Sequence, residues 1–347
     1  MTKDQIIAGF NPNAAASVHT GLFGLPFNAE QSDIIIIPVP WEVTVSFGSG
    51  TADGPAAIEE ASAQIDLYHH DYPKLWKRGI YMDKCPEKLS DLGKKAKAEA
   101  RVLIEAIESG IDPKSDNSLS DILNSVNESC GKMNAWVKQR SAFWKQQGKL
   151  VGLVGGDHSI PLGYLQLQGE DNADFGVLHI DAHMDLRNAY EGFTYSHASI
   201  FFNALKTVPQ ISKLIQVGIR DYCLEENDLC EKNPDRIVVY FDREVRKRFY
   251  KGENWDGLCH EIVGKLPQKV HVSVDIDGLD PKLCPNTGTP VPGGLEYEEL
   301  VHLLNVLKSS GREIIGFDLC EVALGEDGWD GNVGARMLYQ LCGTMAG

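Results

Sequence analysis

Hydrophobic residues occur along this chain in two alternating patterns, which predict alternating strands and helices. The first is a short, nearly continuous run rich in β-branched residues, such as DIIIIPVPWE, and is typical of strands buried on both faces of a parallel sheet. Runs that predict strands lie at 33–42, 150–155, 175–180, 213–221, 236–241, 269–277 and 312–322.

The second pattern has helical spacing and lies between these runs. Leu300, Leu303, Leu304 and Leu307 follow the i, i+3, i+4, i+7 spacing of an amphipathic helix, and further helices are predicted near 198–206 and 255–264. At least seven strands separated by helical segments predict an α/β fold. We expect a three-layer αβα sandwich with a mainly parallel sheet of about eight strands.

Residues 83–149 interrupt this alternation with a longer helical segment. KLSDLGKKAKAEARVLIEAIESG has a helical composition, DPKSDNSLS has the residues of a cap and loop, and a second helix follows. At least one core helix must lie here, because the parallel strand at 150–155 needs a crossover before it. The second helix carries an apolar stripe at Ile122, Val126, Met133, Val137 and Trp144.

The chain shows no internal repeat, low-complexity tract or linker, which predicts a single domain over residues 1–347. Residues 1–32 are expected to form an N-terminal arm, over the sheet or in a subunit contact, and 83–149 an enlarged helical segment within the domain. The glycine-rich loop after the first strand should overhang the carboxyl end of the sheet, with a helix starting at Gly54 and Pro55.

Composition excludes some partners. The net charge of −16 repels nucleic acid and anionic membranes and is compatible with a small cationic substrate. The eight cysteines form no CxxC pair and are expected to be free thiols in a reducing compartment. No run reaches the roughly 18 apolar residues of a membrane span, and the first residues lack a signal pattern. We therefore expect a cytoplasmic protein.

Residue types that bind metal ions follow three of the predicted strands. HIDAHMDLR at 179–187 places two carboxylates and an imidazole on alternate residues, which leave an extended chain on the same side. GLVGGDHS at 152–159 and KVHVSVDIDGLDP at 269–281 carry similar groups at strand ends, where open α/β sheets bind ligands. The candidate ligands are His158, Asp181, His183, Asp185, Asp275 and Asp277.

Two imidazoles and four carboxylates without a thiolate suit Mn²⁺ better than a structural Zn²⁺ site. Six ligands are too many for one tetrahedral ion and suit two octahedral ions that share carboxylates. Such ions, about 3.5–4 Å apart, hold water as hydroxide and polarise an electrophile. A single DxD after a strand is more often a helix cap or a surface turn, but three such stretches favour metal-assisted hydrolysis.

The three stretches resemble the metal signatures of the ureohydrolase family, which includes arginases and agmatinases, and the resemblance covers roughly residues 33–345. It implies two Mn²⁺ ions, with Ni²⁺, Co²⁺ or Fe²⁺ as alternatives, and a homo-oligomer, either a trimer or a hexamer. It also implies hydrolysis of a guanidino compound to urea and an amine. In the implied arrangement Asp181 and Asp275 bridge the ions, His158 and Asp185 complete one site, and His183 and Asp277 complete the other.

Two further residues match catalytic positions of the family. His197, in EGFTYSHASIFF, resembles the histidine that protonates the leaving amine, a role that suits an imidazole with a pKa near neutral. Glu321, in GFDLCEV, resembles the glutamate that binds a guanidinium through charge-assisted hydrogen bonds. Without the resemblance, a surface histidine and a glutamate in a helix cap or salt bridge stay open.

Within the family, DLRNAYEGFTYSHAS, VGIRD and TGTPVPGGL are similar to agmatinases. This favours agmatine, cleaved to putrescine and urea in polyamine metabolism, with Glu191 and Asp53 as candidates for meeting its second cation. Guanidinobutyrate, guanidinopropionate, guanidine, arginine and formimino compounds stay open as substrates. A non-catalytic metal-binding oligomer that regulates a partner is the alternative from another class. The long 83–149 segment and VALGEDGWDGNVG after Glu321 depart from the agmatinase pattern and predict a reshaped pocket.

Overall fold

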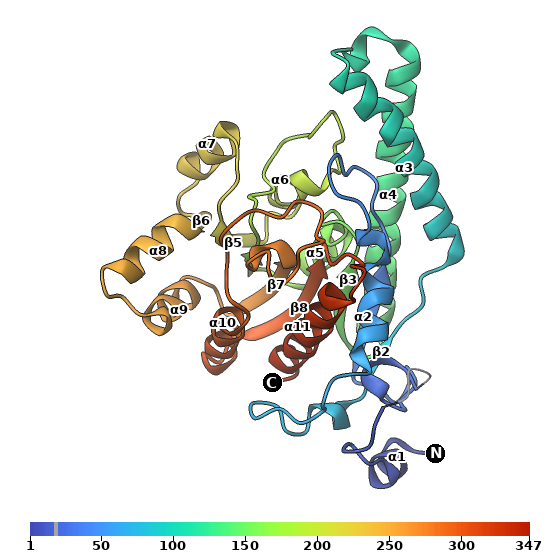
Figure 1. Cartoon of the computed structure of the whole chain (residues 1–347), viewed down its shortest axis with the longest axis vertical. Coiled ribbons are helices and arrows are strands. Elements are labelled where there is room, and N and C mark those ends of the chain that lie inside the picture. Colours follow the sequence, from blue (N-terminus) through green and yellow to red (C-terminus); the bar gives the residue numbers. More distant parts are fainter. Residues whose placement is uncertain (17–19) are drawn as a thin grey trace.

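The computed structural model of the chain describes residues 1–16 and 20–347. Its centre is an eight-stranded sheet in which neighbouring strands are parallel, in the order β2-β1-β3-β8-β7-β4-β5-β6 (Figure 1). All seven predicted strands are present, and β2 is the eighth, so the predicted α/β sandwich is confirmed. The strands are β1 (Ile34–Val39), β2 (Ile80–Met82), β3 (Leu150–Gly155), β4 (Phe175–Ile180), β5 (Ile211–Ile219), β6 (Ile237–Phe241), β7 (Lys269–Asp275) and β8 (Glu313–Cys320).

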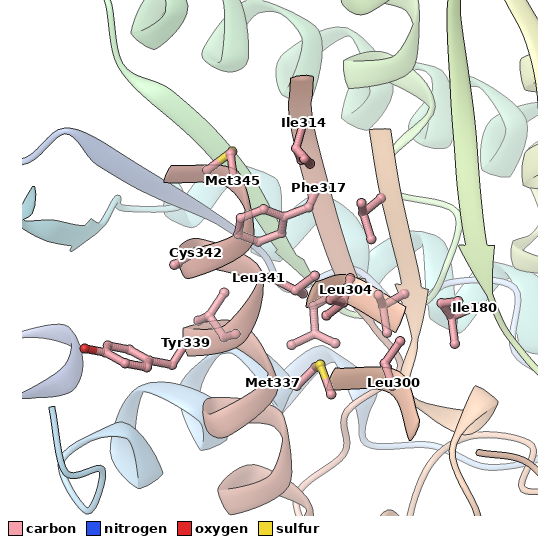
Figure 2. Packing of buried hydrophobic residues seen from close by; sticks show 14 of the residues in the cluster. Ile180, Leu300, Leu304, Ile314, Phe317, Met337, Tyr339, Leu341, Cys342 and Met345 are labelled. Atoms are coloured by element: carbon pink, nitrogen blue, oxygen red, sulfur yellow. The ribbon is translucent and has the colours of Figure 1, made fainter. Parts of the chain in front are cut away.

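Helices cover both faces of the sheet, with separate hydrophobic clusters on the two sides. In Figure 2, Met337 and Leu341 pack beside Leu304 and Phe317 on one face. That face carries α2 (Gly54–Ser62), α8 (Asp242–Tyr250), α9 (Trp255–Gly264), α10 (Tyr297–Ser309) and α11 (Trp329–Ala346). The other face carries α3 (Glu87–Glu108), α4 (Asn117–Lys145), α5 (Leu162–Asp171), α6 (Ile200–Thr207) and α7 (Leu224–Lys232).

The segment at 83–149 folds into the two long helices α3 and α4, as its pattern predicts. They form a hairpin whose far end projects beyond the rest of the molecule (Figure 1). The stripe of α4 packs against β1 and β3, which gives the crossover that the strand at 150–155 requires. Of its members, Ile122 is partly buried, and the buried ones are Val126, Met133, Val137 and Trp144.

The predicted N-terminal arm contains α1 (Lys3–Gly9), and its residues Phe23 and Leu25 pack into the same hydrophobic cluster as α2 and α11. The single-domain organisation stays a prediction. Helices α7, α8 and α11 were not predicted individually. None of the helices within residues 1–16 and 20–347 has both the length and the apolar character needed to cross a lipid bilayer.

The order of the strands brings the predicted functional segments together. The sheet places β3, β8, β7 and β4 side by side at its centre. The three candidate metal-binding stretches and Glu321 follow these four strands. Because parallel strands end at the same edge of a sheet, all four segments meet at one place, outside the carboxyl ends.

Candidate metal centre

The structure brings all six candidate ligands into one cluster around two imidazole nitrogens, and all but the partly exposed His183 are buried. Nδ1 of His158 lies 3.1 Å from Asp181 Oδ2 and 3.3 Å from Asp185 Oδ2. The same nitrogen lies 3.4 Å from Asp275 Oδ2. Three carboxylates from two different strand ends therefore converge on one side of His158.

The second half of the cluster surrounds His183. Nδ1 of His183 lies 3.1 Å from Asp277 Oδ2 and 3.4 Å from Asp181 Oδ1. Asp181 thus faces His158 with one oxygen and His183 with the other. That geometry suits a carboxylate shared by two ions, although the ligand role of all six residues stays a prediction.

The crowded carboxylates shift each other's pKa values. Burial, with the charges of Asp277 and Asp181, raises the pKa of Asp275 well above its usual value. Burial and the charge of Asp181 raise the pKa of Asp185 to about 7. Burial lowers the pKa of His183, but Asp277 and Asp181 outweigh it and raise that pKa to about 12. Protons balance the negative charge here, and divalent cations bound to these oxygen-rich donors would balance it instead.

Buried polar side chains support the cluster from within the sheet. His158 Nε2 lies 2.9 Å from Ser273 Oγ, which donates to Asp318 Oδ1 at 2.7 Å. His179 Nε2 lies 2.7 Å from Asp181 Oδ2. Because Ser273 engages Nε2 of His158, Nδ1 is left facing the carboxylates. These residues were not predicted from the sequence, although His179 and Ser273 each precede a candidate ligand by two positions and share its side of the strand.

A cavity of about 200 Å³ opens over the cluster. Most of the wall residues lie in stretches that the sequence analysis singled out, namely the glycine-rich loop after β1, DLRNAYEGFTYSHAS, VGIRD and TGTPVPGGL. Apart from the candidate site residues, the individual residues were not predicted. Beyond the candidate site residues, the wall includes Ser46, Arg187, Tyr190, Asp221, Tyr222, Glu226 and Thr289.

His197 lines this cavity and begins the short helix η5 (His197–Ser199). Its Nδ1 lies 3.3 Å from the hydroxyl oxygen of Thr44, in the loop after β1. Burial, together with positive charge on His183 and His158, lowers the pKa of His197 to about 4. This pKa lies below the near-neutral value expected from the sequence.

Glu321 lines the same cavity from the end of β8. Its Oε1 accepts a hydrogen bond from the His158 backbone N–H at 3.0 Å. Its Oε2 is buried and has no hydrogen-bond partner among the described residues. Burial and the charges of Asp157 and Asp277 raise the pKa of Glu321 well above its usual value. A buried acceptor without a donor is costly unless a ligand supplies one.

The two candidates for meeting a second cation lie elsewhere. Asp53 is exposed and lines a separate hollow beside α3. It does not line the cavity over the cluster, and its role as a substrate contact stays a prediction. Glu191 directly follows Tyr190, has a left-handed backbone (φ 53°), and its Oε2 lacks a hydrogen-bond partner within the described part of the chain. Burial and the charge of Glu108 raise the pKa of Glu191.

The chain belongs to the arginase family, whose model it matches over residues 32–343. It is an arginase-family ureohydrolase, a hydrolase of C–N bonds in linear amidines. The family depends on a binuclear metal centre, and this chain carries a His/Asp cluster able to hold metal ions.

Curated relatives and solved structures support this assignment. The N(1)-aminopropylagmatine ureohydrolase of Synechocystis sp. is 30% identical over 295 residues, which cover 84% of this chain and 81% of that protein. The protein of the same name from Thermus thermophilus is 28% identical over 315 residues, 90% of each chain. The solved agmatine ureohydrolase of Thermoplasma volcanium has the same fold, with a TM-score of 0.67 at 20% identity, covering 99% of this chain and 97% of that one.

Proposed function

We propose that this enzyme hydrolyses a guanidino compound to urea and an amine, with agmatine, which yields putrescine, as the first candidate substrate. The observation that carries the proposal is the unpartnered, buried Oε2 of Glu321 in the cavity that opens over the two-histidine, four-aspartate cluster. A guanidinium presents paired N–H donors to such a carboxylate. The relatives named for agmatine and aminopropylagmatine support a cationic substrate.

We propose that the six clustered residues hold two divalent ions. One ion position is surrounded by His158, Asp185, Asp181 and Asp275. The other is completed by His183 and Asp277. Two imidazoles and four carboxylates favour Mn²⁺, and Ni²⁺, Co²⁺ or Fe²⁺ bind similar sets. When bound, such ions activate water and polarise the guanidinium carbon.

The protein side chains then position the substrate and move the proton. Glu321 binds the guanidinium nitrogens and orients the carbon toward the cluster. His197 lines the cavity beside the cluster, and its role is to carry a proton from the attacking water to the leaving nitrogen. A C–O bond forms, the C–N bond to the substrate chain breaks, and urea and an amine leave.

The end of the substrate away from the guanidinium is assigned to the edge of the cavity beyond Tyr190. Glu191, whose Oε2 is unpartnered among the described residues, is the proposed group for a second ammonium. A second candidate class is a guanidino acid such as guanidinobutyrate. It is favoured by Arg187, which lines the cavity and stacks on the Tyr190 ring at 4.8 Å. The ion pair of Arg187 with Glu226 is long, at 3.9 Å.

We further propose a cytoplasmic homo-oligomer, a trimer or hexamer. All eight cysteines are free, and six of them are buried, which suits a reducing compartment. Sedimentation of the purified protein measures the oligomer directly.

The test of the proposed function is urea release from a panel of compounds after loading with Mn²⁺. The panel contains agmatine, aminopropylagmatine, guanidinobutyrate, guanidinopropionate, guanidine, arginine and a formimino compound. We expect urea from agmatine or a longer cationic relative, and Glu191→Gln should raise KM for these substrates and not for guanidine. Absence of urea and of any other product throughout the panel contradicts the proposal and favours the non-catalytic alternative.

A further inference from the structure

Two loops from distant parts of the chain meet at His197. One is the loop at 42–53 after β1, and the other is the loop at 186–196 between β4 and η5. Thr44 of the first loop lies 3.3 Å from the ring of His197, which directly follows the second. Figure 1 shows both loops beside the α3–α4 hairpin, at the same end of the sheet.

Helix α3 of the hairpin fixes the first loop through a buried carboxylate. The Glu42 side chain is 1% exposed, and its Oε2 accepts hydrogen bonds from the Gly50 and Ala52 backbone N–H groups at 2.9 and 3.0 Å. Its Oε1 accepts from the Ser49 hydroxyl at 2.7 Å. Lys97 of α3 places its Nζ 2.5 Å from Glu42 Oε1 and supplies the positive charge that a buried carboxylate needs.

Helix α4 fixes the second loop. The side-chain oxygen of Asn127 accepts a hydrogen bond from the Thr194 backbone N–H at 2.8 Å. One turn earlier, Leu123 lies against Gly192, where an added Cβ would be 3.3 Å from it and the backbone has a φ of +86°. This loop therefore rests on α4 immediately before it reaches His197.

The hairpin itself is tied together and anchored to the sheet. Between the helices, the Ser125 hydroxyl donates to Glu99 at 2.7 Å. At the base, Asp83 accepts two hydrogen bonds from Arg140, at 2.5 and 2.7 Å, and one from the Trp144 ring at 2.6 Å. A bidentate arginine with a buried carboxylate holds a defined geometry. The hairpin is therefore held in a fixed position relative to the sheet, and so are the two loops that it contacts.

We propose that the α3–α4 hairpin is a brace for the site, and that Lys97 and Asn127 are positioning residues that hold the two loops converging on His197. The proposal rests on the proposed role of His197 in proton transfer. Neither Lys97 nor Asn127 lines the cavity over the cluster. Their effect is thus exerted through the loops and appears in the chemical step more than in substrate binding.

The experiment compares Asn127→Ala and Lys97→Met with matched controls on the same helices, Asn124→Ala and Lys88→Met. Asn124 and Lys88 are both exposed, so both controls leave the loops untouched. Misplacing a reacting group by about 1 Å costs up to about 100-fold in rate. We expect kcat to fall about tenfold in each test variant, with KM within about twofold of wild type and an unchanged metal content.

Conservative variants separate positioning from general damage. Asn127→Asp keeps an acceptor oxygen for the Thr194 N–H, and Lys97→Arg keeps a cation for Glu42, so both should recover most of the lost kcat. Hydrogen–deuterium exchange gives a readout independent of activity. In Asn127→Ala the amides of 190–196 should exchange faster, and in Lys97→Met those of 49–53, while both controls match wild type.

The outcomes distinguish this inference from the proposed function. If wild type releases urea but the test variants keep wild-type kcat and exchange, the brace is refuted and the function stands. If wild type releases no urea, the function fails, and faster loop exchange in the test variants still supports the brace. Equal losses in the matched controls also refute it.

Discussion

Replacing Glu321 by glutamine is the sharpest test of how the substrate is oriented. Glutamine has nearly the size of glutamate, and the site demands this match, because a Cβ at Gly288 would already lie 3.1 Å from Glu321 Oε2. The amide oxygen of glutamine can still accept the hydrogen bond from the His158 backbone N–H. With a cationic guanidinium bound, which favours the charged form of Glu321, the substitution therefore removes the negative charge and leaves the shape of the cavity intact.

The expected loss of kcat/KM follows from the hydrogen bonds between the Glu321 carboxylate and the guanidinium. Hydrogen bonds to charged groups contribute about 1.5–3 kcal/mol, against about 1 kcal/mol for neutral pairs. With the amide oxygen of glutamine occupied by the His158 N–H, the amide nitrogen takes the place of Oε2 and cannot accept from the guanidinium, so the loss of one charged hydrogen bond costs about 2–3 kcal/mol in transition-state stabilisation. At about 1.4 kcal/mol per factor of ten, kcat/KM should fall about 30- to 150-fold.

The assay measures urea release at several agmatine concentrations, together with the metal content of each protein. Glu326→Gln is the matched control, because Glu326 lies exposed in the same loop and outside the cavity. The control should keep wild-type kinetics. Unchanged kcat/KM in Glu321→Gln refutes the assigned role, and so does a loss of activity that follows a loss of metal.

Four further predictions concern the proton, the metals and the fold. His197→Ala should lower kcat by about 100- to 10,000-fold at unchanged metal content, and equal loss of metal in metal analysis would argue against a proton-transfer role. Asp181→Ala should weaken both metal sites together, because its oxygens face both His158 and His183; loss of one equivalent with the other bound at wild-type affinity, by calorimetry, would contradict a shared carboxylate. Asp83→Ala should lower the free energy of unfolding by about 3 kcal/mol, since it leaves Arg140 and the Trp144 N–H without their partner; urea denaturation measures this, and a wild-type midpoint would be the contrary result. Burial tends to raise the pKa of Glu42, but Lys97 and the loop donors outweigh it and bring that pKa below 4.5. The stability lost in Lys97→Met should thus be largest above pH 4.5 and shrink as the pH falls below it, whereas a difference independent of pH in urea unfolding would show that the ion pair is not its cause.

Local patterns were enough to predict the central strands and the residues that cluster at their ends. The boundaries of β3, β4 and α9 coincide with the predicted ranges, because each is a strongly apolar or periodic segment with a clear end. Alternation within strands, with the requirement that parallel strands end at one edge, was sufficient to predict that Asp181 and Asp275 meet.

The parts that sequence reasoning missed depend on contacts between distant residues. Ser273 shares a side of its strand with Asp275, but only the pairing of β7 with β8 brings Ser273 and Asp318 together behind His158. The lowered pKa of His197 arises from burial beside a cluster whose charge only the assembled fold creates. Asp53 looked suitable because its loop leaves a strand end, but the tether at Glu42 fixes that loop so that Ser46, and not Asp53, reaches the cavity.

The division between inner and outer strands has a consequence for engineering. The candidate metal ligands follow three inner strands, β3, β4 and β7, and Glu321 follows a fourth, β8, whereas Ser46 follows β1 and Tyr222 follows β5, outside that group. Random substitution of Ser46 and Tyr222 can therefore change which guanidino compounds the cavity binds, while the residues proposed for hydrolysis stay unchanged. Such separation makes the chain a suitable starting point for directed evolution.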